Sequence, residues 1–234
     1  ICLTPAHGPK RKSLEWEWSS LVVNKMVERL VDEKYSDGTP YNVQRCNKDG
    51  NHTTEKGYSM VETQQLIKKY GSKCVISVVP HWNGCAGNRF EALMGGEEDY
   101  TRPDSIKLME CIAEEARQVR ERAMNGEFSE MPASAMNGTV KVVHFPPRKK
   151  DGVITYKSSD GATMLNCACA LSENWYADYP DSKEWESSSE ENKKKGKNDG
   201  KYTFMSGWLF SKEGIETIAQ LNAKGIKRYI DTLS

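Results

Sequence analysis

Two of the four histidines in this chain stand where a predicted strand ends. His7 follows the apolar start of the chain, and His81 follows the apolar run over residues 74–80. Because ligands of an open α/β sheet gather outside the carboxyl ends of its strands, both imidazoles can face one site. Imidazole is a frequent metal ligand, so the pair is a candidate metal site. Two structural histidines are the alternative.

A catalytic zinc site commonly takes three ligands from His and carboxylate and leaves a fourth position for water. The helix predicted after His7 offers Glu15 and Glu17. Glu15 lies one turn before Trp18, on the stripe expected to be buried, whereas Glu17 lies on a polar line. We therefore expect Glu15 to point inward as the third ligand. A first-turn glutamate that only complements the helix dipole is the alternative.

Glu173 is the candidate general base. It follows the apolar strand predicted over residues 164–171, again at a carboxyl end. A carboxylate that is not a ligand can take a proton from the attacking water and pass it to the leaving amine. Considered without the other residues, Glu173 could equally be a loop or helix-start carboxylate.

These segments resemble, in order, the motifs of the zinc-dependent N-acetylmuramoyl-L-alanine amidases of bacterial autolysins and phage endolysins: TPAHGP, LEWEWSSLVV, SVVPHWNG and ALSENWYAD. The resemblance implies that His7, Glu15 and His81 bind one zinc ion per chain and that Glu173 is the base. It also implies that the partner is peptidoglycan. The implied reaction is hydrolysis of the amide between the lactyl group of N-acetylmuramic acid and L-alanine.

Two motifs depart from the usual family pattern. Family members usually show Asp/Asn-x-Gly-His-Gly around the first ligand and Ser-x-His-x-Asn around the third. This chain has TPAHG and VPHWN instead. Pro80 removes a backbone donor beside His81, so we expect the surroundings of that ligand to differ from those in the family.

Four residues beside the last two motifs are candidates for substrate contact: Trp82, Asn83, Trp175 and Tyr176. Aromatic rings could wall a groove against the sugar or the stem peptide. Core packing is the alternative for each ring.

Two other functions stay open. A zinc peptidase acting on a different cell-wall bond is one, because metal chemistry does not identify the acyl group. A noncatalytic wall-binding or virion structural module of the same fold is the other, although such a module has no need of a base at Glu173. A phage lysin in the host cytoplasm, a virion-borne hydrolase and an exported bacterial autolysin would share these motifs, so the localisation and oligomeric state are left open.

The order of elements indicates an α/β fold. Amphipathic periodicity predicts helices over residues 14–31, 59–70, 103–124 and 214–233. Apolar runs predict strands at the start of the chain and over 41–46, 74–80, 140–144 and 164–171. Because strands and helices alternate, we expect one domain over 1–234, with a mostly parallel twisted sheet and helices on both faces. The segment 181–201, rich in Ser, Lys and Glu, is expected to be a charged, solvated insertion.

Charge and hydropathy disfavour several classes of protein. The 33 basic and 33 acidic residues cancel, and neither sign is confined to one half, so we expect no nucleic-acid partner. No apolar stretch approaches the ~20 residues that span a bilayer, so we expect a soluble protein without a membrane span. Because the chain begins with Ile1 rather than Met, we expect it to belong to a longer or processed polypeptide.

The seven cysteines are odd in number and lie mostly in apolar segments. This distribution predicts small core residues of a reduced protein. Cys167 and Cys169 could chelate a metal, but they have no companion pair at the spacing of known cysteine zinc sites.

Overall fold

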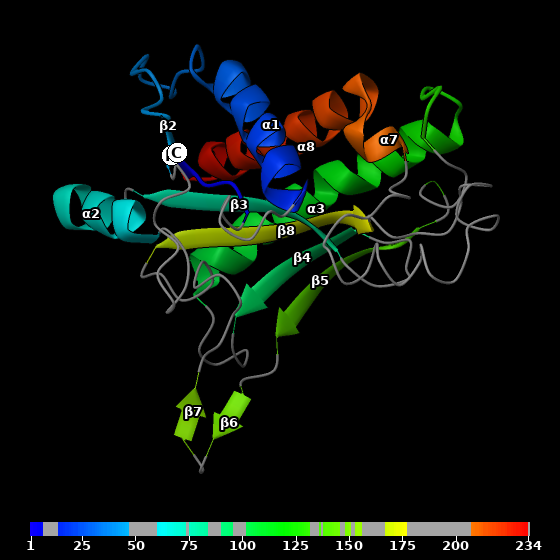
Figure 1. The fold of residues 1–234 in the computed structure, drawn as a ribbon. Helices are drawn as coiled ribbons and strands as arrows, with labels where there is room; N and C mark the ends of the chain where they lie inside the picture. The colour runs from blue at the N-terminus through cyan, green and yellow to red at the C-terminus, as the bar shows by residue number, and fades with distance from the viewer. Residues whose placement is uncertain are drawn as a thin grey trace.

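The fold is that of a computed structural model of the chain (Figure 1). The structure describes residues 1–6, 14–46, 60–73, 75–83, 90–95, 102–131, 136, 138–145, 148–150, 153–155, 167–176 and 207–233. His7 and the charged segment 181–201, for which the sequence makes predictions, lie outside these residues. Their predictions remain predictions.

A six-stranded sheet forms the centre of the molecule, in the order β2-β1-β3-β8-β4-β5. Neighbouring strands are parallel, except that β4 and β8 are antiparallel. The mostly parallel sheet predicted from the sequence is therefore confirmed. The strands are β1 Cys2–Leu3, β2 Gln44–Arg45, β3 Ile76–Asn83, β4 Phe90–Gly95, β5 Val140–Phe145 and β8 Ala168–Tyr176.

Helices cover both faces of this sheet. Three long helices, α1 Leu14–Leu30, α3 Pro103–Met124 and α8 Lys212–Asp231, lie together on one face, with the short α7 Gly207–Phe210 leading into α8 (Figure 1). The remaining helix, α2 Met60–Tyr70, packs on the other face through Leu66 and Ile67. Among the helices that the structure describes, none combines the length and apolarity needed to cross a bilayer.

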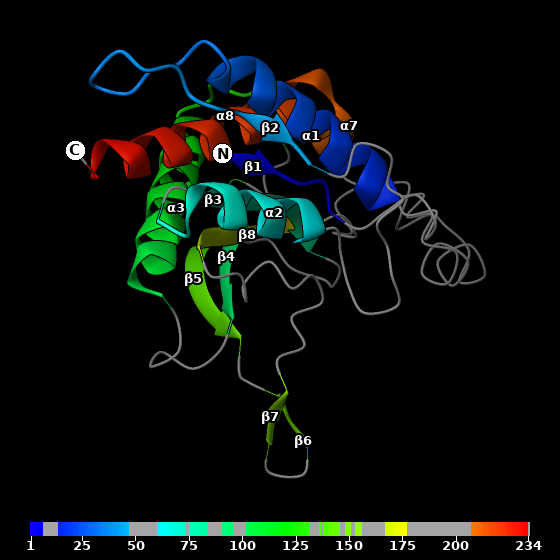
Figure 2. The same cartoon turned by 90° about the vertical axis from the view of Figure 1, so that its left-hand side faces the viewer.

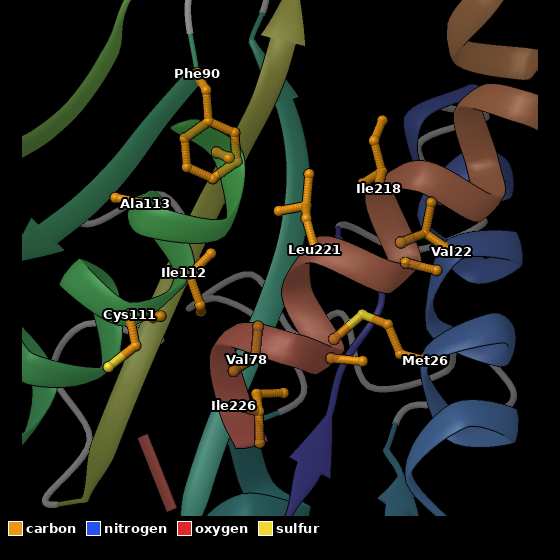
Figure 3. Close-up of a cluster of buried hydrophobic side chains, with 14 of the residues drawn as sticks. Val22, Met26, Val78, Phe90, Cys111, Ile112, Ala113, Ile218, Leu221 and Ile226 are labelled. Atoms are coloured by element: carbon orange, nitrogen blue, oxygen red, sulfur yellow. The ribbon is translucent and has the colours of Figure 1, made fainter. Parts of the chain in front are cut away.

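The alternation of side chains along β3 separates two apolar clusters. Val79 faces the smaller cluster, which α2 covers, and Val78 faces the main core under the three long helices. Within that core, α8 approaches α3 so closely that a Cβ at Gly225 would lie 2.6 Å from the Cα of Ile112. Figure 3 shows the meeting of α1, α3, α8 and the sheet through Val22, Met26, Val78, Phe90, Ile112, Ile218, Leu221 and Ile226.

A second, two-stranded antiparallel sheet is formed by β6 Arg148–Lys150 and β7 Val153–Thr155. Figures 1 and 2 show it projecting away from the central sheet, next to the end of β5. The sequence predicted neither this pair nor β4, because short strands of mixed polarity have no clear hydrophobic period.

Both strands that carry predicted site residues extend further than expected. His81 lies inside β3 and Glu173 lies inside β8, rather than beyond the ends of these strands. The two strands pair with each other through these polar residues. The end of a strand depends on hydrogen bonds to the neighbouring strand. The hydrophobic run within one segment therefore does not predict where that strand ends.

The expectation of a fully reduced protein is wrong for one pair of cysteines. Cys2 in β1 and Cys46, directly after β2, form a disulfide with their Cα atoms 6.1 Å apart. They are 44 residues apart in sequence, so only the pairing of β1 with β2 brings them together. Among the other cysteines that the structure describes, Cys111, Cys167 and Cys169 are buried thiols.

Candidate metal centre

Glu15, His81 and Glu173 meet at the carboxyl end of β3. Each offers one ligand atom, and these three atoms all lie within 4.8 Å of one another. Within the described part of the chain, no other group of three His, Cys, Asp or Glu side chains comes together in this way. Three of the four residues predicted to do chemistry are thus in one place.

The β3–β8 ladder brings two of these residues together. His81 lies directly opposite Glu173 in the register, and residues directly opposite each other project from the same face of a sheet. Because His81 is two positions beyond Val79, this is the face on which α2 packs further along the strands. The three long helices lie on the opposite face.

Glu15 reaches the strand ends from the first turn of α1. Its Oε1 lies 2.9 Å from His81 Nδ1 and accepts a hydrogen bond of 3.2 Å from the backbone N–H of Trp82. The side chains of Glu15 and His81 are 13% and 4% exposed, whereas Glu17 is exposed. Helical periodicity therefore selected the glutamate that the structure places against His81.

Ser19 joins α1 to the two segments that carry the predicted histidine ligands. Its hydroxyl donates to the carbonyl of Pro80 at 2.5 Å and accepts from the backbone N–H of Ala6 at 2.8 Å. Ala6 and Pro80 each directly precede one of those histidines. Sequence reasoning missed Ser19, although its place one helical turn after Glu15 was an available signal.

The two tryptophans predicted to contact substrate lie in the core. Trp82 and Trp175 are each 3% exposed, so little indole surface is left for a sugar or peptide to contact. Packing is the role that the structure gives them, as in the alternative left open by the sequence. The ring centroid of Trp82 lies 5.5 Å from those of Trp18 and Phe210. The ring centroid of Trp175 lies 5.7 Å from that of Phe90 and 5.5 Å from that of Trp208.

The other predicted contacts are described only in their backbone. Asn83 and Tyr176 lie opposite each other in the β3–β8 ladder. Their side chains are outside the described part of the chain. Substrate contact by Asn83 and Tyr176 stays a prediction.

The cysteine pair does not form a second metal centre among the described residues. Cys167 and Cys169 are buried in the small cluster that α2 covers. A hydrogen bond with Cys169, together with burial, raises the pKa of the Cys167 thiol well above its usual range. Because the thiolate is the metal-binding form of cysteine, this environment favours a protonated core residue.

The donor set at the Glu15 group suits a zinc ion. Zinc binds imidazole nitrogen and carboxylate oxygen at about 2.0–2.2 Å, so ligand atoms on one tetrahedral ion lie about 3.3 Å apart. The Glu15–His81 contact of 2.9 Å is near that spacing. Two carboxylates held close together and partly out of water also gain from a cation between them. Glu15 and His81 could hold the ion beside Glu173.

Comparison with known proteins adds a likeness of fold. The sequence matches no protein-family model and no curated protein. The N-acetylmuramoyl-L-alanine amidase of Clostridium difficile 630 superposes with a TM-score of 0.55 at 12% identity, over 100% of this chain and 97% of that chain. The amidase Ami1 of Mycobacterium smegmatis superposes with a TM-score of 0.52 at 11% identity, over 99% and 96%. The chain has the fold of these amidases.

The amidase of Mycobacterium abscessus has the same fold, with a TM-score of 0.51 at 11% identity and coverage of 100% and 97%. At such identities the likeness lies in the path of the backbone. The amidase fold agrees with the α/β class predicted from the sequence and with the family that the four motifs resemble. Because a shared fold does not establish a shared reaction, the chemistry must be inferred from the side chains at the carboxyl end of β3.

Proposed function

We propose that this chain is a zinc-dependent N-acetylmuramoyl-L-alanine amidase. Its reaction would be hydrolysis of the amide bond between the lactyl group of N-acetylmuramic acid and the L-alanine of the stem peptide in peptidoglycan. The observation that carries the proposal is the meeting of Glu15, His81 and Glu173 at one strand end. The amidase fold and the resemblance of the four motifs support the choice of substrate.

Glu15 and His81 would hold the zinc ion, with His7 as the third predicted ligand. A bound zinc ion lowers the pKa of water towards 7 and polarises a carbonyl group. Glu15 is oriented for binding by the backbone N–H of Trp82, and the short contact with His81 keeps the two donors together. Both side chains are held by elements of the core, which limits their movement when a metal arrives.

Glu173 would transfer the proton that the reaction requires. It takes a proton from the attacking water as the water oxygen bonds to the lactyl carbonyl carbon. It then gives that proton to the alanine nitrogen as the carbon–nitrogen bond breaks. The products are a free lactyl carboxylate on the glycan and a stem peptide with a free amino terminus. Its place opposite His81 in the ladder puts the carboxylate beside His81 and Glu15.

The disulfide supports action outside a reducing cytosol. Disulfide bonds form and persist in oxidising surroundings such as the cell exterior and the virion surface. The Cys2–Cys46 bond therefore favours an exported or virion-borne protein that meets peptidoglycan from outside. This location is part of the proposal.

Metal analysis and digestion of purified peptidoglycan test the proposal together. We expect about one zinc per chain in the purified protein, and release of stem peptides with free amino-terminal L-alanine, identified by mass spectrometry. Products cut inside the stem would instead show a zinc peptidase. Binding to the wall without any cleavage would show a noncatalytic module, and a folded protein that takes up no zinc would contradict the mechanism.

A further inference from the structure

Three polar side chains are fully buried behind the candidate metal centre. Ser172 and Asn174 flank Glu173 in β8, and Asn222 comes from the middle of α8. All three are 0% exposed, in a region where most neighbours are apolar. Polar groups in such surroundings destabilise the fold unless each is hydrogen-bonded, so their bonds must be traced.

These three residues form a closed hydrogen-bond network, here called the Asn222 network. The Ser172 hydroxyl donates to Asn222 Oδ1 at 2.8 Å, and Asn222 Nδ2 donates to Asn174 Oδ1 at 3.0 Å. Asn174 Nδ2 completes the circuit by donating to Ser172 Oγ at 3.0 Å and to the Ser172 carbonyl at 2.8 Å. Asn222 also donates to the carbonyl of Ile218 within its own helix at 2.9 Å.

The network reaches the backbone of a predicted metal ligand. Asn174 Nδ2 donates to the carbonyl of His81 at 2.9 Å, which ties β8 to β3 at the site itself. The same amide lies next to Glu173 in sequence. One side chain thus holds the strand of the predicted base against the strand of the predicted ligand.

A β-bulge begins at this point. His81 pairs with Glu173 and Asn83 pairs with Tyr176, so two steps along β3 oppose three steps along β8. Trp175, inside the bulge, has a φ of 60°, which is strained for a large aromatic residue. Such a conformation persists only where the surroundings enforce it. Packing of Trp175 on Phe90 and Trp208 and the bonds of the Asn222 network supply that enforcement.

Register matters here because the side chains of a strand alternate. A slip of β8 by one residue would carry Glu173 to the opposite face, towards α8 and away from His81. We propose that Asn174 and Asn222 are positioning residues, which hold the bulge and so keep Glu173 opposite His81. The proposal rests on the metal chemistry of the proposed function. A purely structural role, in which the network only packs α8 on the sheet, is the alternative.

An apolar replacement of the whole network separates these two roles. The variant Ser172→Ala/Asn174→Leu/Asn222→Leu removes all three polar side chains, and leucine keeps the branched shape of asparagine. Exchanging side chains that hydrogen-bond to one another for apolar groups often preserves stability, and the backbone carbonyl of His81 then loses the bond from Asn174. Leu221→Ala is the matched control, because Leu221 is a core residue of the same helix, 1% exposed, that lies outside the network.

Three measurements on the full chain decide the outcome: thermal unfolding of the metal-free protein, zinc affinity by competition with a chromogenic chelator, and kcat and KM for a muramoyl-peptide. We expect the triple variant to fold cooperatively, to bind zinc about 10–100-fold more weakly and to lose kcat at similar KM. We expect Leu221→Ala to unfold at a lower temperature with zinc affinity and kcat near wild type.

Wild-type zinc affinity and kcat in the folded triple variant would overturn the proposal, and so would equal losses in Leu221→Ala. If the triple variant does not fold, the milder Asn222→Ser is used, and unchanged zinc affinity and kcat there also overturn it. Failure of the proposed function is distinct: the wild-type protein would then bind no zinc. A wild-type protein that binds zinc but cleaves no peptidoglycan still allows the zinc measurement to test the network.

Discussion

Two carboxylates, those of Glu15 and Glu173, lie beside His81. Glu15 accepts a backbone hydrogen bond from Trp82 and contacts His81 directly, which is the arrangement of a ligand held in advance. Glu173 projects from a strand in which both neighbouring residues belong to the Asn222 network. At the scale of single residues, the contacts of Glu15 with His81 and Trp82 suit the ligand role proposed for it.

Glu173→Gln should retain zinc and lose turnover. Glutamine has nearly the same shape but cannot accept and release the proton, so we expect kcat to fall by about 10²–10⁴-fold. Zinc content by elemental analysis and turnover of a muramoyl-peptide check this. Glu17→Gln, an exposed position on α1, should leave both quantities unchanged. Loss of zinc from Glu173→Gln would make Glu173 a ligand instead.

Ser19→Ala should weaken both the fold and the metal site. It leaves a buried carbonyl at Pro80 and a buried N–H at Ala6 without this partner, which costs about 1–3 kcal/mol. We expect a lower free energy of unfolding in urea and a weaker zinc affinity. Ser20→Ala is the control, because Ser20 is also buried and its hydroxyl makes no hydrogen bond within the described residues. Equal effects in both variants would argue against the role of Ser19.

At the scale of elements, the site depends on how short strands are held in place. β1 consists only of Cys2–Leu3, yet it lies between β2 and β3 and leads towards the predicted first ligand. The Cys2–Cys46 disulfide joins the first residue of β1 to the residue after β2. Covalent closure compensates here for the few ladder hydrogen bonds that two-residue strands can form.

Removal of this disulfide should destabilise the protein. Because it closes a loop across 44 residues of sequence separation, Cys2→Ala/Cys46→Ala should lower the free energy of unfolding by about 2–4 kcal/mol. Reduction of the wild-type protein should lower its unfolding temperature to a similar extent. Peptide mapping without reductant provides the direct check, and the absence of a linked Cys2–Cys46 peptide would contradict the pairing.

At the scale of the whole molecule, the main hydrophobic core and the side chains of His81 and Glu173 lie on opposite faces of the sheet. The main core lies between the sheet and α1, α3 and α8, and α2 packs on the other face (Figure 2). By the alternation of side chains along β3 and β8, His81 and Glu173 project from the face on which α2 packs. Carboxylates also fasten the long helices to their surroundings. Glu213 accepts from the backbone N–H groups of Ser129 and Glu130, and Glu216 pairs with Arg29 of α1.

Because these carboxylates are ionised in the folded protein, we expect the free energy of unfolding to depend on pH in the acid range. Burial alone would raise the pKa of Glu213, but hydrogen bonds from Ser129, Glu130 and Trp208 outweigh it and lower the pKa below its ordinary value of 4.5. A group with a depressed native pKa stabilises the fold above its unfolded pKa, and this stabilisation is lost as the pH falls through the native pKa. We therefore expect the free energy of unfolding to decrease once the pH falls below about 4.5.

Glu213→Gln should reduce this decrease, as measured by urea unfolding at a series of pH values. The variant should already be less stable at neutral pH, where the wild-type carboxylate is ionised. Glu121→Gln is the control at an exposed position of α3. A pH dependence in Glu213→Gln identical to that of the wild type would show that Glu213 does not contribute.

The sequence by itself determined which kinds of residue meet and on which faces. Helical periodicity selected Glu15 over Glu17, because the side of a helix that carries apolar residues must turn towards the core. The alternation of strands and helices predicted the mostly parallel sheet, and such a sheet collects the ends of its strands at one edge. His81 and Glu173 could therefore be assigned to one place before their distance was known.

Only the tertiary structure decided how these residues are held. The disulfide, the bonds of Ser19 and the Asn222 network each join segments that are distant in sequence. The burial of Trp82 and Trp175 and the bulge beside Glu173 likewise depend on neighbouring elements. Hydrophobic period is a local property that tells which face of an element is buried. Hydrogen-bond partners and strand register depend on contacts between elements that are distant in sequence. Only the packing of the whole chain in three dimensions determines them.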